Sequence, residues 1–184
     1  SATPNGWGDG PDTPLVYDSC ADLWRAVITM TDGEWKVRQN NDWAVNYGDT
    51  GLNGTLDEGG DNIPVGAGTY LVTVNFNDFS YTIEEIDLWG IVGSGYNDWG
   101  GAGPDYPFTP DYCNEGIYNA YGVPLVDGEI KFRLNNDWGV NYGDTGLDGI
   151  LEEGGDNIPV TEGIYDIVLD FTNPSVPTYT LTAK

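Results

Sequence analysis

Alternation of apolar and polar residues is the strongest structural signal in this chain. The run at positions 68–76, GTYLVTVNF, places every second side chain on one face: Tyr70, Val72, Val74 and Phe76. A second run, FSYTIEE at positions 79–85, alternates in the same way after Asn77-Asp78. Runs of period two separated by an Asn-Asp pair predict two strands joined by a two-residue hairpin turn.

A third run, EIKFRL at positions 129–134, also alternates. Its apolar residues are predicted to face inward: Ile130, Phe132 and Leu134. Its charged residues are predicted to face outward: Glu129, Lys131 and Arg133. No long stretch has apolar residues at helical spacing, and the 27 Gly and 11 Pro fit many short strands joined by tight turns. We therefore predict an all-β fold.

The chain contains two copies of one module. Arg38–Val65 and Arg133–Val160 are identical at 23 of 28 positions, and the copies lie about 93–95 residues apart. The similarity extends back to NGWGDGPD at 5–12 against NDWGGAGPD at 97–105. A period of this length indicates whole domains. Several strands in each copy predict two tandem immunoglobulin-like antiparallel β-sandwich domains.

The predicted domain boundaries are 1–86 and 87–184. The second copy opens with DLWGIVGS at positions 87–94, a strand-like run that precedes its NDW segment. The first copy starts at SATPNGW and has no such run. We therefore expect the chain to begin inside the first domain, with the opening edge strand of that domain missing or replaced.

The charge of the chain narrows the class of ligand. Thirty Asp and Glu residues against six Lys and Arg give a formal net charge of −24. Binding to nucleic acid needs clusters of basic residues, and the sequence contains no such cluster, so a nucleic-acid partner is disfavoured. Anionic polysaccharides are disfavoured for the same reason. The remaining consequence of the charge is solubility through self-repulsion.

Cysteine and histidine content argues against a transition-metal site. The chain has no His and two Cys, so a Cys/His zinc site is excluded. Cys20 and Cys113 fall at matching places of the two copies, where residues seldom meet, and buried free thiols are expected. Calcium is an alternative for the acidic loops Gly48–Asn62 and Gly143–Asn157, but Asx turns explain these loops equally well. No metal and no cofactor is predicted.

Cations and tryptophans recur together in both copies. Four of the six cationic side chains lie on the duplicated strand: Lys36, Arg38, Lys131 and Arg133. They could form ion pairs with neighbours such as Asp42 or Asp49. A polar turn after this strand carries Trp43 or Trp138, and a Gly-rich loop carries Trp7 or Trp99. These indoles either pack over a local core or form an exposed contact surface, and exposed apolar groups rimmed by polar ones mark binding sites.

A sugar ring would match this combination of residues. The C–H face of a pyranose can lie on an indole, while its hydroxyls accept hydrogen bonds from cations and amides. A single site of this kind is weak. Two tandem sites on one polymer raise the effective affinity without any new contact, which is a physical reason to duplicate the module.

The repeated blocks carry a resemblance to a known family. The pattern LWGIVGS…NDWGG, then GEIKFRLNNDWGVNYGD, EEGGDNIPV and GIYDIVLDF, resembles the C-terminal starch-binding modules of the SusE/SusF outer-membrane lipoproteins of Bacteroidetes, over nearly the whole chain. The resemblance implies a non-catalytic protein on the extracellular face of the outer membrane. There it would be held by an N-terminal lipid and present α-glucan to a glycan-import complex.

The resemblance also implies a set of binding residues. A sugar is expected on two tryptophans with a lysine between them: Trp7, Lys36 and Trp43 in the first copy, and Trp99, Lys131 and Trp138 in the second. Additional donors are expected from four residues: Arg38, Arg133, Asn41 and Asn136.

Three other functions stay open at this point. The modules could bind another neutral glycan such as laminarin. They could also be structural or adhesive sandwiches without a sugar ligand, which predicts buried tryptophans. A glycoside hydrolase needs two carboxylates about 5–10 Å apart across a cleft, and a domain of this size leaves little room for one. The chain is therefore not expected to be an enzyme.

Overall fold

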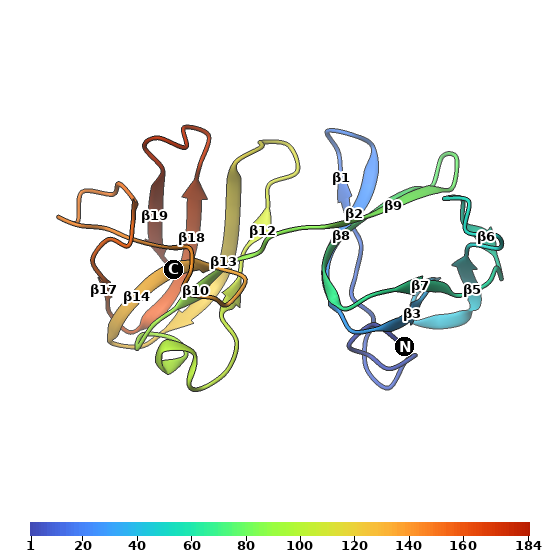
Figure 1. Cartoon of the computed structure of the whole chain (residues 1–184), viewed down its shortest axis with the longest axis horizontal. Coiled ribbons are helices and arrows are strands. Elements are labelled where there is room, and N and C mark those ends of the chain that lie inside the picture. The colour runs from blue at the N-terminus through green and yellow to red at the C-terminus, as the bar shows by residue number, and fades with distance from the viewer. The chain divides into compact units, whose positions relative to one another are not determined.

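The computed structural model describes residues 1–184, which form two compact units, Ser1–Ile86 and Asp87–Lys184. Regular structure in both units is almost entirely antiparallel strand, and the single helical element is the short 3-10 turn η1 (Asp98–Gly100) (Figure 1). The all-β prediction is confirmed. No helix in the chain combines the length and apolar character needed to cross a bilayer.

The second unit contains two main sheets. One has the order β12-β13-β18-β19, with bounds Thr109–Pro110, Ile117–Leu125, Gly163–Asp170 and Thr178–Ala183. The other has the order β11-β10-β14-β15-β16, with bounds Tyr106–Pro107, Trp89–Val92, Gly128–Leu134, Asn141–Gly143 and Glu152–Glu153. Strand β17 (Ile158–Val160) also pairs with β14. The long strands of both sheets can be followed in Figure 1.

One apolar core joins these two sheets. Ile91 and Phe132 from the β10–β14 pair are fully buried in the same cluster as Ile167 and Leu169 from β18. Burial of their alternate side chains is what the period-two pattern predicts, because successive residues of a strand point to opposite faces. The assignment of the two units to immunoglobulin-like β-sandwich domains stays a prediction.

The first unit repeats this plan with shorter strands. Its larger sheet has the order β1-β2-β8-β9, with bounds Val16–Asp18, Leu23–Met30, Gly68–Asn75 and Ser80–Glu85. The remaining strands form a β3–β7 pair and a β4-β5-β6 sheet. Their bounds are Gly33–Trp35 and Ile63–Val65, then Val37–Gln39, Asp42–Gly48 and Asp57–Glu58. Met30, Trp35 and Val72 lie in its core.

The predicted hairpin after position 68 forms, but its turn is longer than expected. Strands β8 and β9 pair in register as far as Asn75 and Ser80, so four residues rather than two connect them. Phe79 takes a φ of 59° in this turn, and the Asp78 carboxylate accepts hydrogen bonds from the amide and hydroxyl of Ser80. The side chain of Asp78 thus closes the turn that its sequence position suggested.

The expectation of buried free thiols is wrong. Cys20 and Cys113 are both exposed, and neither is a free thiol.

The acidic loops are built around one buried carboxylate in each copy. Asp49 is fully buried and accepts hydrogen bonds from the amides of Asn53 and Gly54 and from the hydroxyl of Tyr81. Asp144 repeats this arrangement with Tyr179. Burial alone would raise the pKa of Asp49, but these donors, together with the backbone of Leu52, lower it below its ordinary value. Burial and the hydrogen bond to Asp49 raise the pKa of Tyr81 to about 12.

Removing the Tyr81 hydroxyl, which donates a hydrogen bond to Asp49, should destabilise the first unit. We expect Tyr81→Phe to cost about 1.5–3 kcal/mol, because the buried carboxylate of Asp49 loses a hydrogen bond to a charged group. Urea denaturation monitored by tryptophan fluorescence measures this cost. Tyr70→Phe removes an exposed hydrogen bond to a neutral carbonyl and should cost less than about 1 kcal/mol. Equal losses in the two variants would contradict the role given to Asp49.

The same variant should change the response to acid. Because the pKa of Asp49 is lowered in the folded state, its contribution is fully present above the unfolded value of about 3.9 and is lost as the pH falls through the folded value. Tyr81→Phe removes one of the donors that lower this pKa. Acid unfolding of the variant should therefore begin at a higher pH, measured by circular dichroism between about pH 2 and 6.

Candidate functional site

The four loop and turn tryptophans form two pairs, one in each unit. The ring centroids of Trp7 and Trp43 are 5.8 Å apart with an interplanar angle of 47°. Those of Trp99 and Trp138 are 6.0 Å apart with an angle of 38°. Residues more than thirty positions apart in sequence therefore meet in the same way twice.

A tight hairpin turn positions one tryptophan of each pair. Strands β4 and β5 pair at Gln39 and Asp42, so Asn40 and Asn41 form a two-residue loop, with φ values of 58° and 54°. Two successive residues at positive φ define a type I′ turn, in which Asn is favoured. Trp43 is the second residue of β5, one position after Asp42. Asn135 and Asn136 have nearly the same φ values before Trp138.

The other tryptophan of each pair has an unusual backbone conformation. Trp7 has a φ of 71° and Trp99 a φ of 58°, in the left-handed region that bulky residues seldom occupy. The side chain of Asn97 holds the loop of Trp99, since its oxygen accepts hydrogen bonds from the amides of Gly93 and Gly100. Strained residues persist where surrounding contacts fix them, and they concentrate at functional sites.

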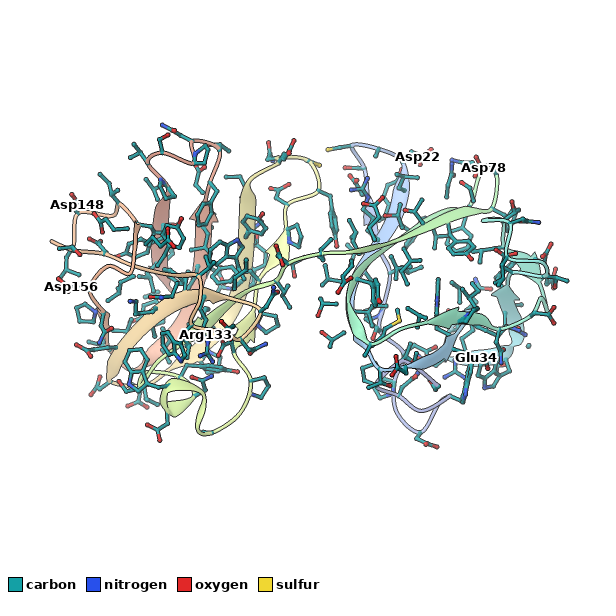
Figure 2. The ribbon with its side chains drawn as sticks, viewed as in Figure 1. Asp22, Glu34, Asp78, Arg133, Asp148 and Asp156 are labelled. Atoms are coloured by element: carbon teal, nitrogen blue, oxygen red, sulfur yellow. The ribbon has the colours of Figure 1, made fainter.

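A buried arginine packs against the Trp99–Trp138 pair of the second unit. The guanidinium of Arg133 lies 4.6 Å from the centroid of the Trp138 ring and makes two hydrogen bonds to Asp105, of 2.6 and 2.8 Å. Its side chain is 6% exposed and that of Asp105 is 2% exposed. Figure 2 labels Arg133 beside the loop that carries η1, and a guanidinium nitrogen closely approaches Gly100 in that loop.

Arg38 occupies the same position in the first unit. It lies 4.6 Å from the Trp43 ring centroid and makes a paired hydrogen bond to Asp12. The hydrogen bond to Asp12 raises the pKa of Arg38 above its ordinary value, against the effect of burial. The sequence analysis was therefore right that these cations form ion pairs. The partners of Arg38 and Arg133, however, are Asp12 and Asp105 rather than Asp42 or Asp49.

The predicted outward orientation of the cations is only partly right. Arg133 and Lys131 are both buried, and burial lowers the pKa of Lys131. These residues alternate away from the core as predicted, but the η1 loop and the ion pair cover the face of β14 on which Arg133 lies. Lys36 is half-buried and donates a 2.7 Å hydrogen bond to the carbonyl of Gly60. The cation over the indole is thus an arginine rather than a lysine.

The predicted amide donors connect the turn to the loop. The Asn41 side chain accepts a hydrogen bond from the Asp12 amide, and Asn136 accepts one from the Asp105 amide, both at 2.8 Å. Asn97 in turn donates to the Asp105 carboxylate. Sequence reasoning missed the role of these aspartates and of Asn97. The signal was available, because both copies place an Asn two residues before the tryptophan and an Asp after Gly-Pro.

One tryptophan of each pair exposes apolar surface to solvent among polar residues. Trp43 is 42% exposed and Trp138 is 44% exposed, while Trp7 and Trp99 are half-buried. The arginine beneath each pair is already neutralised by an aspartate. The exposed surface can therefore make stacking contacts with an uncharged ligand, with nearby side chains as hydrogen-bond donors.

No protein-family model matches the sequence, and no curated protein matches it. Among solved structures, the chain is similar to the crystal structure of SusF from Bacteroides thetaiotaomicron, with 15% sequence identity and a TM-score of 0.38. The alignment covers 92% of this chain and 44% of SusF, so the chain spans less than half the length of that protein.

Proposed function

We propose that this chain is a non-catalytic glycan-binding protein with one aromatic site in each unit. The observation that carries the proposal is the pairing of tryptophans at 5.8 and 6.0 Å, with an exposed ring in each pair. A purely structural role predicts buried rings. Exposed indoles held on a rigid, hydrogen-bonded turn are preorganised, which reduces the entropic cost of binding.

The charge of each site favours a neutral ligand. Arg38 and Arg133 are each paired with an aspartate, so neither offers a free positive charge to an anionic sugar. The net charge of −24 also opposes the approach of a polyanion. Lys36 lines the same cavity as Trp7 and Trp43 and uses one N–H on Gly60. An ammonium has three donors, so two remain for sugar hydroxyls.

The inclination of the rings favours a curved glycan. Planes inclined at 47° and 38° cannot both lie flat on one straight, ribbon-like chain. Successive pyranoses of an α-glucan turn relative to one another, so two neighbouring sugar faces can each meet one indole. We therefore propose starch-like α-glucan as the ligand, with laminarin as the alternative because its chain also curves.

The wider setting is part of the same proposal. We propose that the chain acts on the extracellular face of the outer membrane, where tandem sites hold polysaccharide for proteins of a glycan-import complex. Binding two points of one polymer raises the effective affinity, so weak individual sites suffice for capture.

A fluorescence titration tests the ligand class. We expect maltoheptaose to change the tryptophan emission saturably, with little dependence on salt because the ligand is uncharged. Cellohexaose serves as the straight-chain control and laminarihexaose as the curved alternative. A response to laminarihexaose alone would keep the binding role and change the substrate. No response to any of the three would contradict the glycan-binding proposal.

A further inference from the structure

The tryptophan pairs have carboxylates beside them that no cation neutralises. In the second unit, the exposed residues Asp98 and Asp137 directly precede Trp99 and Trp138 in the chain. Neither takes part in an ion pair. Asp137 accepts one hydrogen bond through Oδ1, from the amide of Gly139, so its Oδ2 remains available to a ligand.

Each unit places a carboxylate in the tryptophan loop by a different route. The first unit has Gly6 and Asp9 where the second unit has Asp98 and Gly101. A Cβ on Gly6 would lie 2.8 Å from Oδ2 of Asp9, and a Cβ on Gly101 would lie 3.6 Å from Oδ2 of Asp98. In both units the carboxylate therefore lies close to the other of these two positions. The exchange of Asp and Gly leaves a negative charge beside the loop tryptophan.

The acid in the turn is the same residue type in both units. Asp42 matches Asp137, and its Oδ1 accepts a hydrogen bond from the amide of Ala44. Its charge acts on the arginine of the first site. The hydrogen bond to Asp12 is the main cause of the raised pKa of Arg38, and the negative charge of Asp42 raises that pKa further.

The cations of the second site already have acids close to them. Arg133 is paired with Asp105. Burial lowers the pKa of Lys131, and the negative charge of Asp156 opposes that effect. The two carboxylates of the loop and turn are therefore in excess, and they leave the site with net negative charge.

An indole with an exposed face beside a carboxylate attracts organic cations. The ring face carries the negative part of the quadrupole, and the carboxylate adds Coulombic attraction. The chain already contains such a contact, because the guanidinium of Arg133 lies 4.6 Å from the centroid of the Trp138 ring. Trp138 remains 44% exposed. A sugar that stacks on it can therefore bring an amino substituent close to the acids of the loop and turn.

Resting on the glycan-binding function proposed above, we infer that each tryptophan pair prefers glycans with a protonated amino group to neutral glycans of the same linkage. The ligand class is thus a curved glycan with amino substituents, and a primary amine carries a positive charge at pH 7. The net charge of −24 attracts any cation at long range, so the contribution of the site has to be measured separately from it.

Three ligands of one length test the preference. They are maltoheptaose, a derivative in which an amine replaces the C6 hydroxyl of the non-reducing glucose, and a derivative with a carboxylate at that carbon. Isothermal titration at pH 7 and low salt should show the amine derivative binding at least about threefold tighter than maltoheptaose, and the carboxylate derivative binding most weakly. At about 0.5 M salt the amine preference should fall below about twofold, because exposed charges are screened.

Conservative variants assign the preference to the site. They are made in a chain that carries Trp43→Ala, so that only the second unit binds. Asp98→Asn keeps a residue that tolerates the φ of 50° at this position, and Asp137→Asn can still accept the hydrogen bond from Gly139. Each should weaken binding of the amine derivative more than binding of maltoheptaose. Glu162→Gln removes the same charge from an exposed residue outside the loop and turn, and it should leave the preference unchanged.

The outcomes separate the preference from the binding function. Equal affinity for the amine derivative and maltoheptaose would overturn the preference and leave glycan binding intact. An equal loss of preference in Glu162→Gln and the two aspartate variants would also overturn it, because the attraction would then come from the net charge. No binding of any of the three ligands would overturn both the preference and the glycan-binding function.

Discussion

Replacing Trp43 and Trp138 together by alanine should abolish glycan binding. Each substitution removes the more exposed ring of its pair and leaves the half-buried Trp7 or Trp99 as a single contact. Truncation of a central aromatic residue is among the most damaging changes at a binding surface. Isothermal titration with maltoheptaose should give no measurable heat for the double variant.

Each single variant should distinguish site affinity from avidity. For maltoheptaose, Trp43→Ala should halve the number of binding sites and leave the affinity of the remaining site unchanged. For soluble starch, the apparent affinity should fall on the order of 100-fold, because two-point attachment is lost. Tyr121→Ala, which removes an exposed aromatic ring outside the site, is the control and should have no effect. Unchanged starch binding in the double variant would refute the assignment of the site.

Removing Asp105 should be the most destabilising single change at the site. Asp105→Ala leaves the guanidinium of Arg133 buried without its counter-charge, and breaking a buried ion pair in this way typically costs about 3–5 kcal/mol. The Asp105 carboxylate also accepts a hydrogen bond from Asn97, which holds the loop of Trp99. We therefore expect loss of glycan binding at the second unit together with a lower unfolding midpoint in guanidinium chloride.

Asp12→Ala is the matched variant in the first unit. The Asp12 side chain is 24% exposed against 2% for Asp105, so water can replace more of the lost interaction. We expect a clearly smaller loss of stability than for Asp105→Ala. The variant Arg133→Met, which removes the charge while keeping apolar volume, should recover part of the stability when combined with Asp105→Ala. An equal cost for the two aspartate variants would show that burial of the pair does not determine its contribution.

The sequence by itself determined the all-β class, the duplication and the residues on which the candidate site is centred. Periodicity fixed which side chains of β8 and β14 enter the core, because a strand exposes alternate residues to opposite faces. The repeated Trp, Arg and Asn positions identified the site because the same combination occurs twice in a chain with few cations.

Only the tertiary structure determined which contacts those residues make. The partners Asp12 and Asp105 lie 26 and 28 positions from their arginines, and no local pattern specifies a contact at that separation. The covering of Lys131 and Arg133 and the tilt between the indoles depend on which segments pack together in three dimensions. These features arise from long-range packing, whereas strand periodicity is a local property of the chain.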